Sequence, residues 1–433
     1  MTLPRVALTT LGCKTNQFES AVMAEKLAGE GFPVVRFDDT ADVYIINTCT
    51  VTARTDAESR RLVRRVMKRN PAARIVVTGC YAQVSPDELQ NMPGVTLVIG
   101  NSEKRDISRF IRELGHDRKV VVSDISRERL AETLPLESFA EHTRAFLQVQ
   151  NGCDSFCSYC IVPYARGRSR SVSPEDALAA VEGSTRRGFR EVVLTGIHLS
   201  GYGRDLDPPV PLHQLLQSIA DNQLAQRLRL GSLEPTEISD QLIQLIAGAG
   251  IICPHLHIPL QSGNDAVLSR MNRNYTSRFF ENLVGRLMAA VPDLCLGLDL
   301  IAGFPGETEE EFQQTYSLIQ RLSVSYLHVF PFSPRPGTPA ATMQGQVPSR
   351  VVTERARLLR ELSEQKRLAY GDSFIGKEVQ VLVQSQGEGG LLQGLSRHYL
   401  PVSFPGPSSL QNEELTVLIH SASAGTLFGT SSR

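Results

Sequence analysis

Long apolar runs are missing from this sequence. No stretch of its 433 residues approaches the roughly 18–20 consecutive apolar residues that are needed to span a bilayer. The start of the chain, Met1–Val6, also lacks the cationic residues followed by an apolar run that mark a secretory signal. We therefore expect neither a membrane anchor nor export, which leaves the cytoplasm as the default location.

An excess of charge of either sign is missing as well. The chain has 45 lysines and arginines against 46 aspartates and glutamates, a formal net charge of −1. This balance excludes a surface that is cationic all over, so any contact with nucleic acid has to come from a local patch. Internal repeats and low-complexity segments are also absent, and the length of 433 residues predicts about two to four globular domains.

Short apolar stretches alternate with amphipathic ones along most of the chain, the pattern of a parallel α/β sheet. In the first part the predicted strands are 5–9, 43–47 and 75–78, with helices over 19–30, 54–68 and 86–91. The alternation restarts at residue 145 and runs for six units, with strands near 145–150, 191–195, 227–231, 255–260, 294–301 and 326–330. Six units are too few for the usual eight-stranded closed barrel, so they indicate a partial (β/α)6 barrel.

The end of the chain is rich in strands. A charged helix over 349–370 precedes predicted strands at 379–383, 387–392, 399–404 and 414–420, which lie among glycines and prolines. This pattern is typical of a small β-barrel. The predicted fold class is therefore α/β, with an N-terminal parallel α/β domain over 1–135, a partial barrel with its connecting helix over 136–369, and a small all-β barrel over 370–433.

Three of the eight cysteines form a C-x3-C-x2-C run, Cys153, Cys157 and Cys160, directly after the first strand of the partial barrel. In a chain without a secretory signal, clustered thiols usually bind metals rather than form disulfides. Three thiolates on a short loop can hold one corner of a cubane iron–sulfur cluster and leave its fourth iron open. Zinc is the alternative, but it normally takes four ligands, and nothing near the loop supplies the fourth.

Three further cysteines, Cys13, Cys49 and Cys80, are far apart in the sequence, but each stands just beyond the predicted carboxyl end of a strand. Because these ends share one edge of a parallel sheet, where sites form, the three thiolates can converge. We expect a second cluster there, again with three ligands and one open iron. Cys253 and Cys295 lie in apolar runs without thiol neighbours and are expected to be inert.

The segments around these cysteines resemble a known family. The loop, with Tyr159 before its last cysteine, resembles the motif of the radical S-adenosylmethionine (SAM) superfamily. The segments LGCKTNQ, NTCTVT and TGCYAQ, around Cys13, Cys49 and Cys80, resemble the methylthiotransferase family, and the similarity covers nearly the whole chain.

The resemblance implies two cofactors and several partners. SAM would bind the open iron of the first 4Fe-4S cluster and be cleaved to a 5′-deoxyadenosyl radical. An auxiliary 4Fe-4S cluster on the N-terminal cysteines would take part in sulfur delivery, and the C-terminal barrel would be an RNA-binding TRAM domain. A reducing electron donor and a sulfur source are therefore expected partners.

Other matching segments stand at the carboxyl ends of barrel strands, where a SAM pocket is expected. Thr195 and Gly196 follow the second strand, and Ser232 and Glu234 (in SLEP) follow the third. The segments HIPLQSGN, MNRNY and DLIAGFPGET resemble family segments that line the SAM and substrate cleft. After the matching segment PYARGRSRS, Val172 stands where many members carry a basic residue. The predicted cofactor-binding residues are Tyr159, Thr195, Gly196, Ser232, Glu234, Gln261, Arg273 and Asp299.

One predicted helix carries a cationic face. Over 54–69, cations four residues apart form two rows, which are Arg60, Arg64 and Lys68, and Arg61, Arg65 and Arg69. Most such runs are simply solvated faces. This helix, however, begins just after Cys49 and can place phosphate contacts beside the auxiliary cluster. The predicted RNA-binding residues are Arg60, Arg61, Arg64, Arg65 and Lys68.

The resemblance also indicates a substrate. LGCKTNQ and NTCTVTARTDAESR resemble the branch that adds a methylthio group to C2 of N6-threonylcarbamoyladenosine next to the anticodon, so the tRNA anticodon loop is the expected partner. The tail from residue 370 is weakly acidic, which a basic protein partner tolerates better, and the main alternative is the branch that modifies an aspartate of a ribosomal protein. A non-catalytic electron-transfer protein would explain the cysteines but not the pocket motifs.

Overall fold

The computed structural model describes residues 3–115, 117–131 and 143–431. They fall into two compact units. One comprises the residues up to 131 together with 148–172 and 333–341, and the other comprises 143–147, 173–332 and 342–431. The cysteine loop therefore belongs to the same unit as the N-terminal domain. The predicted boundary at 135 lies outside the described residues, and the three-part division stays a prediction. Within the described ranges, no helix has the length and apolar character that a membrane crossing requires.

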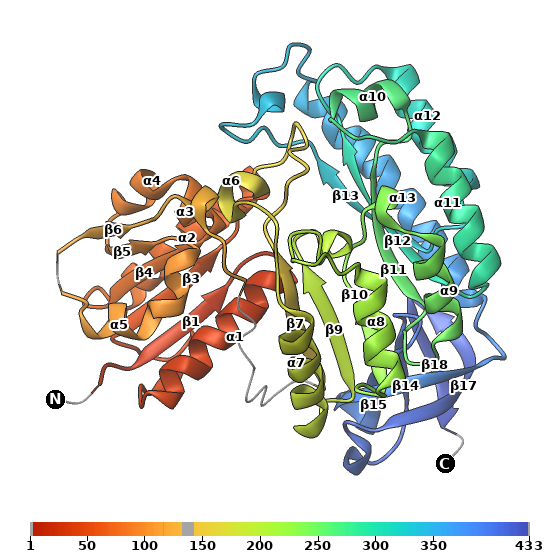
Figure 1. Cartoon of the computed structure of the whole chain (residues 1–433), viewed down its shortest axis with the longest axis horizontal. Helices are drawn as coiled ribbons and strands as arrows, with labels where there is room; N and C mark the ends of the chain where they lie inside the picture. Colours follow the sequence, from red (N-terminus) through yellow and green to blue (C-terminus); the bar gives the residue numbers. More distant parts are fainter. Residues whose placement is uncertain (1–2, 116, 132–142, 432–433) are drawn as a thin grey trace. The chain divides into compact units, whose positions relative to one another are not determined.

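A six-stranded parallel sheet forms the centre of the first unit (Figure 1), in the order β2-β1-β3-β4-β5-β6. Its strands are β1 (Val6–Thr10), β2 (Val34–Val35), β3 (Val43–Thr48), β4 (Arg74–Gly79), β5 (Val95–Ile99) and β6 (Lys119–Val121). Its helices are α1 (Lys14–Gly29), α2 (Ala53–Arg69), α3 (Cys80–Val84), α4 (Pro86–Gln90) and α5 (Ile107–Arg112). Along β3, Ile45 packs with α1 and α5 on one face and Ile46 packs with α2 and α4 on the other, so the sheet is buried on both faces.

The predicted strands at 5–9, 43–47 and 75–78 are confirmed to within one residue at each end. Helix α2 also lies where it was expected, and Thr52 and Thr55 form a capping box at its start. Helix α1 begins at Lys14 rather than at residue 19, because Cys13 already occupies the N-cap position. The short strands β2, β5 and β6 were not predicted.

The order of the strands reverses next to β1. Strand β2 lies on one side of β1, and β3, β4 and β5 follow on the other side. In open α/β sheets, the crevice at the carboxyl ends of the two strands flanking such a reversal is where ligands bind. The crevice between the ends of β1 and β3 is therefore the expected binding edge of this sheet.

The second unit holds the partial barrel, whose strands run in parallel. They are β9 (Glu191–Gly196), β10 (Arg227–Leu230), β11 (His255–Gln261), β12 (Cys295–Ala302) and β13 (Tyr326–Pro331). Isolated parallel bridges, Leu228 to Ile252 and Ser232 to His257, connect β10 with the β11 segment. Strand β7 (Arg144–Asn151) starts in this unit and ends in the first, where it pairs with β8 (Arg170–Ser171).

Helices lie between the barrel strands and after the last of them. They are α7 (Pro174–Arg186), α8 (Leu212–Asp221), α9 (Asp240–Gly248), α10 (Asp265–Arg270), α11 (Ser277–Ala290), α12 (Glu309–Arg321) and α13 (Ser349–Asp372). The six predicted barrel strands are confirmed to within one residue at each end. Thr308, the predicted N-cap of α12, forms a capping box with Glu311.

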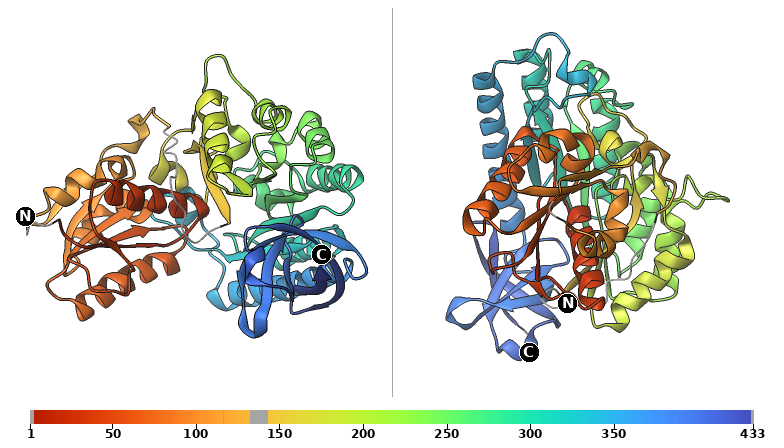
Figure 2. Two further views of the ribbon diagram at one scale, coloured as in Figure 1. Left: turned by 90° about the horizontal axis from the view of Figure 1, so that it is seen from below. Right: turned by 90° about the vertical axis from the view of Figure 1, so that its left-hand side faces the viewer.

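The C-terminal strands close into a small barrel (blue in Figure 2) in the order β14-β15-β16-β18-β17. The strands are β14 (Glu378–Gln386), β15 (Leu391–Ser396), β16 (Pro401–Pro405), β17 (Glu414–Ser423) and β18 (Thr426–Ser431). The predicted strand at 387–392 is wrong in position, because the amide of Gly387 donates to the carbonyl of Leu391 and the chain turns there. Strand β18 was not predicted. The α/β fold class, with its parallel sheet and its small closed barrel, is confirmed.

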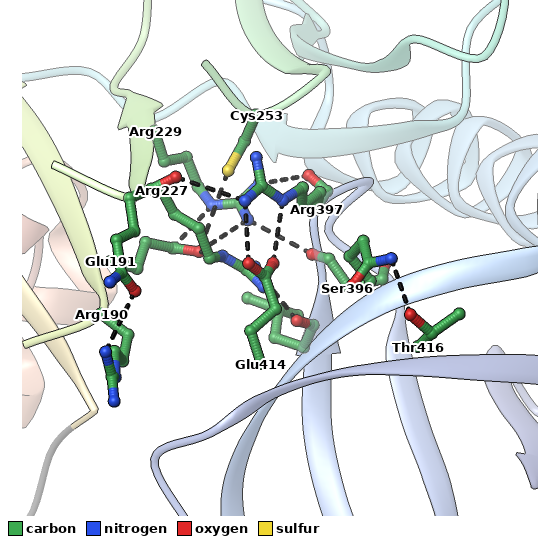
Figure 3. Close-up of polar contacts among 12 residues, drawn as sticks. Arg190, Glu191, Arg227, Arg229, Cys253, Ser396, Arg397, Glu414 and Thr416 are labelled. Atoms are coloured by element: carbon green, nitrogen blue, oxygen red, sulfur yellow. Dashed lines mark hydrogen bonds and ion pairs between the residues drawn. The ribbon is translucent and has the colours of Figure 1, made fainter. Parts of the chain in front are cut away.

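A buried ion cluster lies between the partial barrel and the C-terminal barrel (Figure 3). Glu191 of β9 accepts from Arg229 Nε at 2.8 Å and from Arg227 Nε at 2.9 Å, and all three side chains are fully buried. Arg227 also donates to Glu414 of β17 at 2.9 Å, and Arg397 pairs with the same carboxylate at 2.8 Å. The two cations of β10 therefore share one buried carboxylate and bind the C-terminal barrel.

Candidate active site

The three N-terminal cysteines lie at the carboxyl ends of neighbouring strands. Cys13 follows β1 and stands at the N-cap of α1. Cys49 directly follows β3, and Cys80 is the first residue of α3, directly after β4. Since β1, β3 and β4 are adjacent in the sheet, the structure brings the three residues to one edge, at the strand reversal.

The loops that carry these cysteines pack closely against one another. Gly12 has a φ of +99°, and a Cβ added there would lie 2.7 Å from Cys49 Sγ, so only glycine fits. Asn16 Nδ2 donates to the carbonyl of Thr48 at 3.0 Å, and Asn47 Nδ2 donates to the carbonyl of Asn16 at 3.0 Å. These reciprocal bonds explain the asparagines of LGCKTNQ and NTCTVT, because they hold the first two loops in a fixed geometry.

The donors at this edge suit an iron–sulfur cluster. Cys49 and Cys80 are buried, Cys13 is exposed, and none of the three is in a disulfide. Burial raises the pKa of the Cys49 thiol to about 11, with a contribution from the neighbouring Cys80 and Cys13. Metal ions bind the thiolate, so loading this site has to displace a proton. Three converging sulfurs on a rigid edge fit the predicted cluster with one open iron.

The second triplet lies on the loop after β7. The amide of Cys153 donates to the carbonyl of Gly167 at 3.1 Å, and the amide of Cys160 donates to the carbonyl of Cys157 at 2.9 Å. The amide of Ser155 donates to Cys153 Sγ at 3.5 Å. A side chain on Gly152, whose φ is +74°, would collide with the carbonyl of Arg168, so the loop can only close with glycine at this position. The short loop and its three sulfurs fit a cluster as well.

The segment that follows this loop carries a buried arginine that sequence reasoning did not single out. Arg166 ends α6 (Val162–Arg166), is 1% exposed and donates through Nε to Cys80 Sγ at 3.2 Å. It also forms an ion pair with Glu19 of α1. The only signal in the sequence was its place in PYARGRSRS, because a buried charge leaves no periodic pattern.

A second buried arginine of the first unit was also missed. Arg335 donates to Thr50 Oγ1 at 2.6 Å and pairs with Asp56 near the start of α2. Thr50 directly follows Cys49, so Arg335 supports the second cysteine loop. No motif in the sequence pointed to this residue.

The predicted SAM-pocket residues of the second unit separate into groups. Arg273 pairs with Glu234 Oε1 at 2.6 Å, and its Nε donates to Tyr275 Oη at 3.2 Å. The Tyr275 hydroxyl in turn donates to the carbonyl of Leu260 at 2.8 Å. Burial raises the pKa of Glu234, although Arg273 lowers it. The structure therefore brings Glu234 and Arg273 together beside the end of β11.

Asp299 of β12 belongs to a different group. His257 Nε2 lies 2.8 Å from Asp299 Oδ1, and His328 Nδ1 lies 3.4 Å from the same oxygen. Burial would raise the pKa of Asp299, but the hydrogen bonds from the two histidines hold it well below its usual range. Sequence reasoning found the aspartate and missed both histidines, which alternate with apolar residues on β11 and β13.

The other predicted pocket residues have different positions and partners. Thr195 and Gly196 end β9, but the Thr195 hydroxyl donates to the carbonyl of Leu147 at 3.1 Å, so it stabilises the sheet. Ser232 is exposed, and Gln261 is buried at the end of β11 with a φ of +68°. Tyr159 is half-buried and lies in the first unit with the cysteine loop. The roles of all eight residues stay predictions.

The cationic face of α2 differs from the predicted pair of rows. Arg60 turns toward α3 and α4. Its Nη1 donates to Tyr81 Oη and, at 2.9 Å, to Glu88 Oε1. The exposed cations line a shallow surface groove formed by Arg61, Arg64, Arg65, Lys68 and Arg69. Glu58 and Asp38 pair with Arg61 and Arg65, and both arginines stay more than half exposed. These five exposed cations, which come from both predicted rows, are the part of the helix that phosphates can reach.

Family models match two regions of the chain. Residues 5–100 match a model described as "Uncharacterized protein family UPF0004", and residues 147–319 match the "Radical SAM superfamily". Two solved structures of the radical S-adenosylmethionine methyltransferase TsrM from Kitasatospora setae share the fold, with TM-scores of 0.56 and 0.57 at 16% and 17% identity. They cover 82–83% of this chain, which covers 82–85% of theirs.

Curated relatives are considerably closer in sequence. A threonylcarbamoyladenosine tRNA methylthiotransferase of Aquifex aeolicus is 41% identical over 88% of this chain and 92% of its own length. The protein of that name from Bacillus subtilis is 39% identical over 96% and 93%. A tRNA-2-methylthio-N(6)-dimethylallyladenosine synthase of Desulfitobacterium hafniense is 33% identical over 98% and 97%.

These similarities extend over the N-terminal sheet, the cysteine loop and the partial barrel. A 4Fe-4S cluster and SAM are the cofactors that radical SAM chemistry requires. Identity near 40% over most of both chains makes the protein a transferase enzyme. The chain belongs to the radical SAM tRNA methylthiotransferase family.

Proposed function

We propose that this enzyme adds a methylthio group to C2 of N6-threonylcarbamoyladenosine next to the anticodon of tRNA. The observation that carries the proposal is the convergence of Cys13, Cys49 and Cys80 at the strand reversal, in a chain that also has the radical SAM loop. The names of relatives with 38–41% identity support the choice of nucleoside. The cytoplasm, where tRNA is modified, is the proposed location.

Each cysteine triplet has its own proposed role. Cys153, Cys157 and Cys160 would hold the cluster that chelates SAM, and Cys13, Cys49 and Cys80 would hold an auxiliary cluster for sulfur delivery. When bound, the cofactors supply one-electron reductive cleavage of SAM and a source of sulfur. The protein's share is to hold the thiolates on rigid loops and keep water from the reacting groups. An electron donor and a sulfur source remain required partners.

Residues of the barrel would bind SAM and orient it. The set proposed there is Thr195, Gly196, Ser232, Glu234, Gln261, Arg273 and Asp299, and Tyr159 of the cysteine loop is proposed separately as a SAM-binding residue. Glu234 offers a carboxylate to the amino group of SAM, and Arg273 holds that carboxylate in place at 2.6 Å. The hydroxyl of Thr195 is already bonded within the sheet, so we assign only backbone donors to this position.

A test of the proposed substrate compares three acceptors. Anaerobically reconstituted enzyme with SAM, dithionite and sulfide should give a methylthio product on tRNA that carries threonylcarbamoyladenosine. The same tRNA without the threonylcarbamoyl group, and a tRNA with dimethylallyladenosine, should give less than a tenth of that product. Nucleoside mass spectrometry measures each yield. A product mainly on dimethylallyladenosine, or on a ribosomal protein, would refute the assignment.

The groove on α2 is the proposed phosphate-binding surface. The double variant Arg61→Glu with Arg65→Glu should weaken binding of all tRNAs alike and lower the log–log salt dependence by about 0.7–0.9 per lost contact. Binding is measured by filter retention at several salt concentrations. The variant should keep its clusters and still cleave SAM without tRNA, since neither residue is proposed to touch a cofactor.

A matched control carries the same change in net charge elsewhere. Arg186→Glu with Arg357→Glu alters two exposed arginines of α7 and α13 whose ion pairs within the described residues are with neighbours on their own helices. Equal losses of tRNA affinity in the two double variants would mean that net charge, and not the α2 groove, determines binding. An unchanged salt slope in the α2 variant would remove this helix from the RNA path.

A non-catalytic electron-transfer protein is the alternative of another class. The glutamate–arginine pair at the end of β11 and the family membership both argue against it. Reductive cleavage of SAM by the reduced protein would exclude it.

A further inference from the structure

Arg166 connects the segment after the radical SAM loop to the N-terminal cysteine edge. It follows Cys160 by six residues at the end of α6, and both belong to the first unit. Its side chain is 1% exposed, so the guanidinium is held by protein groups rather than by water. Its Nε lies 3.2 Å from Cys80 Sγ, with the N–H directed at the sulfur.

Two further groups fix the position of this guanidinium. Its Nη2 lies 3.1 Å from Glu19 Oε2, its Nη1 pairs with the other oxygen of Glu19, and Nη2 also donates to Asn16 Oδ1. Both acceptors belong to α1, the helix that Cys13 caps. The buried side chain of Arg166 therefore bonds both α1, which begins directly after Cys13, and the sulfur of Cys80.

The charges around Cys80 leave an excess of one positive charge. Lys104 is buried and also pairs with Glu19, so two cations share one carboxylate. Burial alone would raise the pKa of Glu19, but Arg166 and Lys104 lower it to about 2, so the carboxylate is ionised at neutral pH. Because the low dielectric of the protein interior strengthens electrostatic interactions, this buried positive charge acts strongly on the nearby Cys80 sulfur.

We propose that Arg166 is a positioning residue that raises the reduction potential of the auxiliary cluster through its N–H···S hydrogen bond to Cys80. This inference rests on the proposed function, since it requires that Cys13, Cys49 and Cys80 hold a 4Fe-4S cluster. One-electron reduction from the 2+ to the 1+ state adds negative charge to the cluster and its thiolates. A hydrogen-bond donor with a positive charge stabilises the reduced state more than the oxidised state.

Arginine suits this task better than lysine. Its planar fork presents donors in fixed directions, so Nε can reach the sulfur while both Nη atoms bind Glu19 and Asn16. A lysine ammonium at this position would keep the charge but could not serve the three acceptors in this geometry. Arg166→Lys should therefore shift the potential less than Arg166→Gln does.

The experiment isolates the auxiliary cluster. In the full chain, Cys153→Ala, Cys157→Ala and Cys160→Ala together remove the loop ligands, and the protein is reconstituted anaerobically with iron and sulfide. A redox titration with dithionite as the electron source, followed by electron paramagnetic resonance, gives the midpoint potential of the 2+/1+ couple. Adding Arg166→Gln should lower the reduced-to-oxidised ratio at the parent's midpoint by at least about tenfold, which for one electron is a shift of about 59 mV.

A second variant guards against a loss of folding, because Arg166→Gln leaves Glu19 without its buried partner. The pair Arg166→Gln with Glu19→Gln removes one charge of each sign, keeps the local excess of one positive charge on Lys104, and still lacks the N–H···S bond. It should also lower the midpoint. Arg168→Gln is the matched control, because Arg168 lies on the same segment but is exposed and pairs with Asp154, and it should leave the midpoint unchanged.

The possible failures are distinguishable. If the parent without its loop cysteines gives no 4Fe-4S signal and no iron, the two-cluster proposal is refuted. If the parent has the cluster and either glutamine variant keeps the cluster with the parent's midpoint, the role of Arg166 is refuted. A shift of equal size in Arg168→Gln would likewise show that the effect is not specific to the bond with Cys80.

Discussion

Replacing Cys157 with alanine is expected to abolish reductive cleavage of SAM. Cys157 is the buried member of the loop triplet, and a site with only two of its three cysteines should fail to hold the cluster whose open iron SAM chelates. Cleavage is measured as 5′-deoxyadenosine formed per enzyme after reduction with dithionite, and the variant should form less than a hundredth of the amount made by the wild type. The methylthio product should disappear with it.

Replacing Cys49 with alanine should separate the two clusters. The loop triplet is intact in this variant, so SAM cleavage should continue, while the methylthio product should be lost because the auxiliary site has only two sulfurs. Wild-type protein should hold about eight irons per chain and the variant about four. A wild-type yield of methylthio product from Cys49→Ala would refute the role of the N-terminal triplet.

Cys295→Ala provides the control for both variants. Cys295 is buried at the start of β12 and lies outside both triplets. The substitution removes a thiol that is also buried without touching either site, so the full iron content and product yield should remain. Loss of iron from this variant would mean that the iron counts report stability rather than ligation.

Glu191→Gln should strongly lower the free energy of unfolding of the second unit. Glu191, Arg227 and Arg229 are all 0% exposed, and removing the carboxylate leaves the buried Arg229 without its anion and Arg227 with Glu414 alone. Breaking a buried pair in this way costs about 3–5 kcal/mol. Urea unfolding can be followed by tyrosine fluorescence, because the chain has no tryptophan and Tyr399 lies 5.2 Å from Arg229.

The same group makes stability depend on pH. Burial would raise the pKa of Glu191, but Arg229 and Arg227 lower it to about 2, below its ordinary value of 4.5. Because the pKa of Glu191 is lower in the folded protein than in the unfolded chain, its ionised carboxylate stabilises the folded state fully at pH values above 4.5. This stabilisation is lost as the pH falls from 4.5 toward 2. The wild type should therefore lose more stability than Glu191→Gln over this range. Equal losses would contradict the assigned pKa.

An exposed ion pair gives the comparison for Glu191. Glu182 and Arg186 pair on the surface of α7, with side chains 43% and 72% exposed. Glu182→Gln should change the free energy of unfolding by less than about 1 kcal/mol, because water already solvates both groups. A loss in Glu191→Gln no larger than this would show that the ion cluster does not hold the C-terminal barrel in place.

The sequence could predict the strands that carry the cysteines. Strands β3 and β4 are apolar runs that end at Cys49 and Cys80, and the common direction of parallel strands brings such ends to one edge. The reversal of strand order at β1 could not be predicted, because the strand that defines it, β2, has only two residues. The cysteine edge was therefore expected, but not its place at the binding crevice.

Buried charges were the part of the site that sequence patterns did not reveal. Arg227 and Arg229 stand two residues apart in β10 and so face the same side of the sheet, a pattern that a half-exposed strand also shows. Whether such a side is buried depends on Glu191 and Glu414, which are distant in the sequence. Arg166 was hidden for the same reason, since only the fold brings it to Glu19 and Cys80.

Mass spectrometry of tRNA nucleosides from cells tests most directly whether this enzyme modifies threonylcarbamoyladenosine. The gene is expressed in a bacterial strain whose tRNA carries threonylcarbamoyladenosine without a methylthio group. We expect 2-methylthio-threonylcarbamoyladenosine to form when the wild-type protein is expressed and not to form with Cys49→Ala. Unmodified threonylcarbamoyladenosine in cells that contain the wild-type protein with both clusters, or a methylthio group on another nucleoside alone, would contradict this expectation.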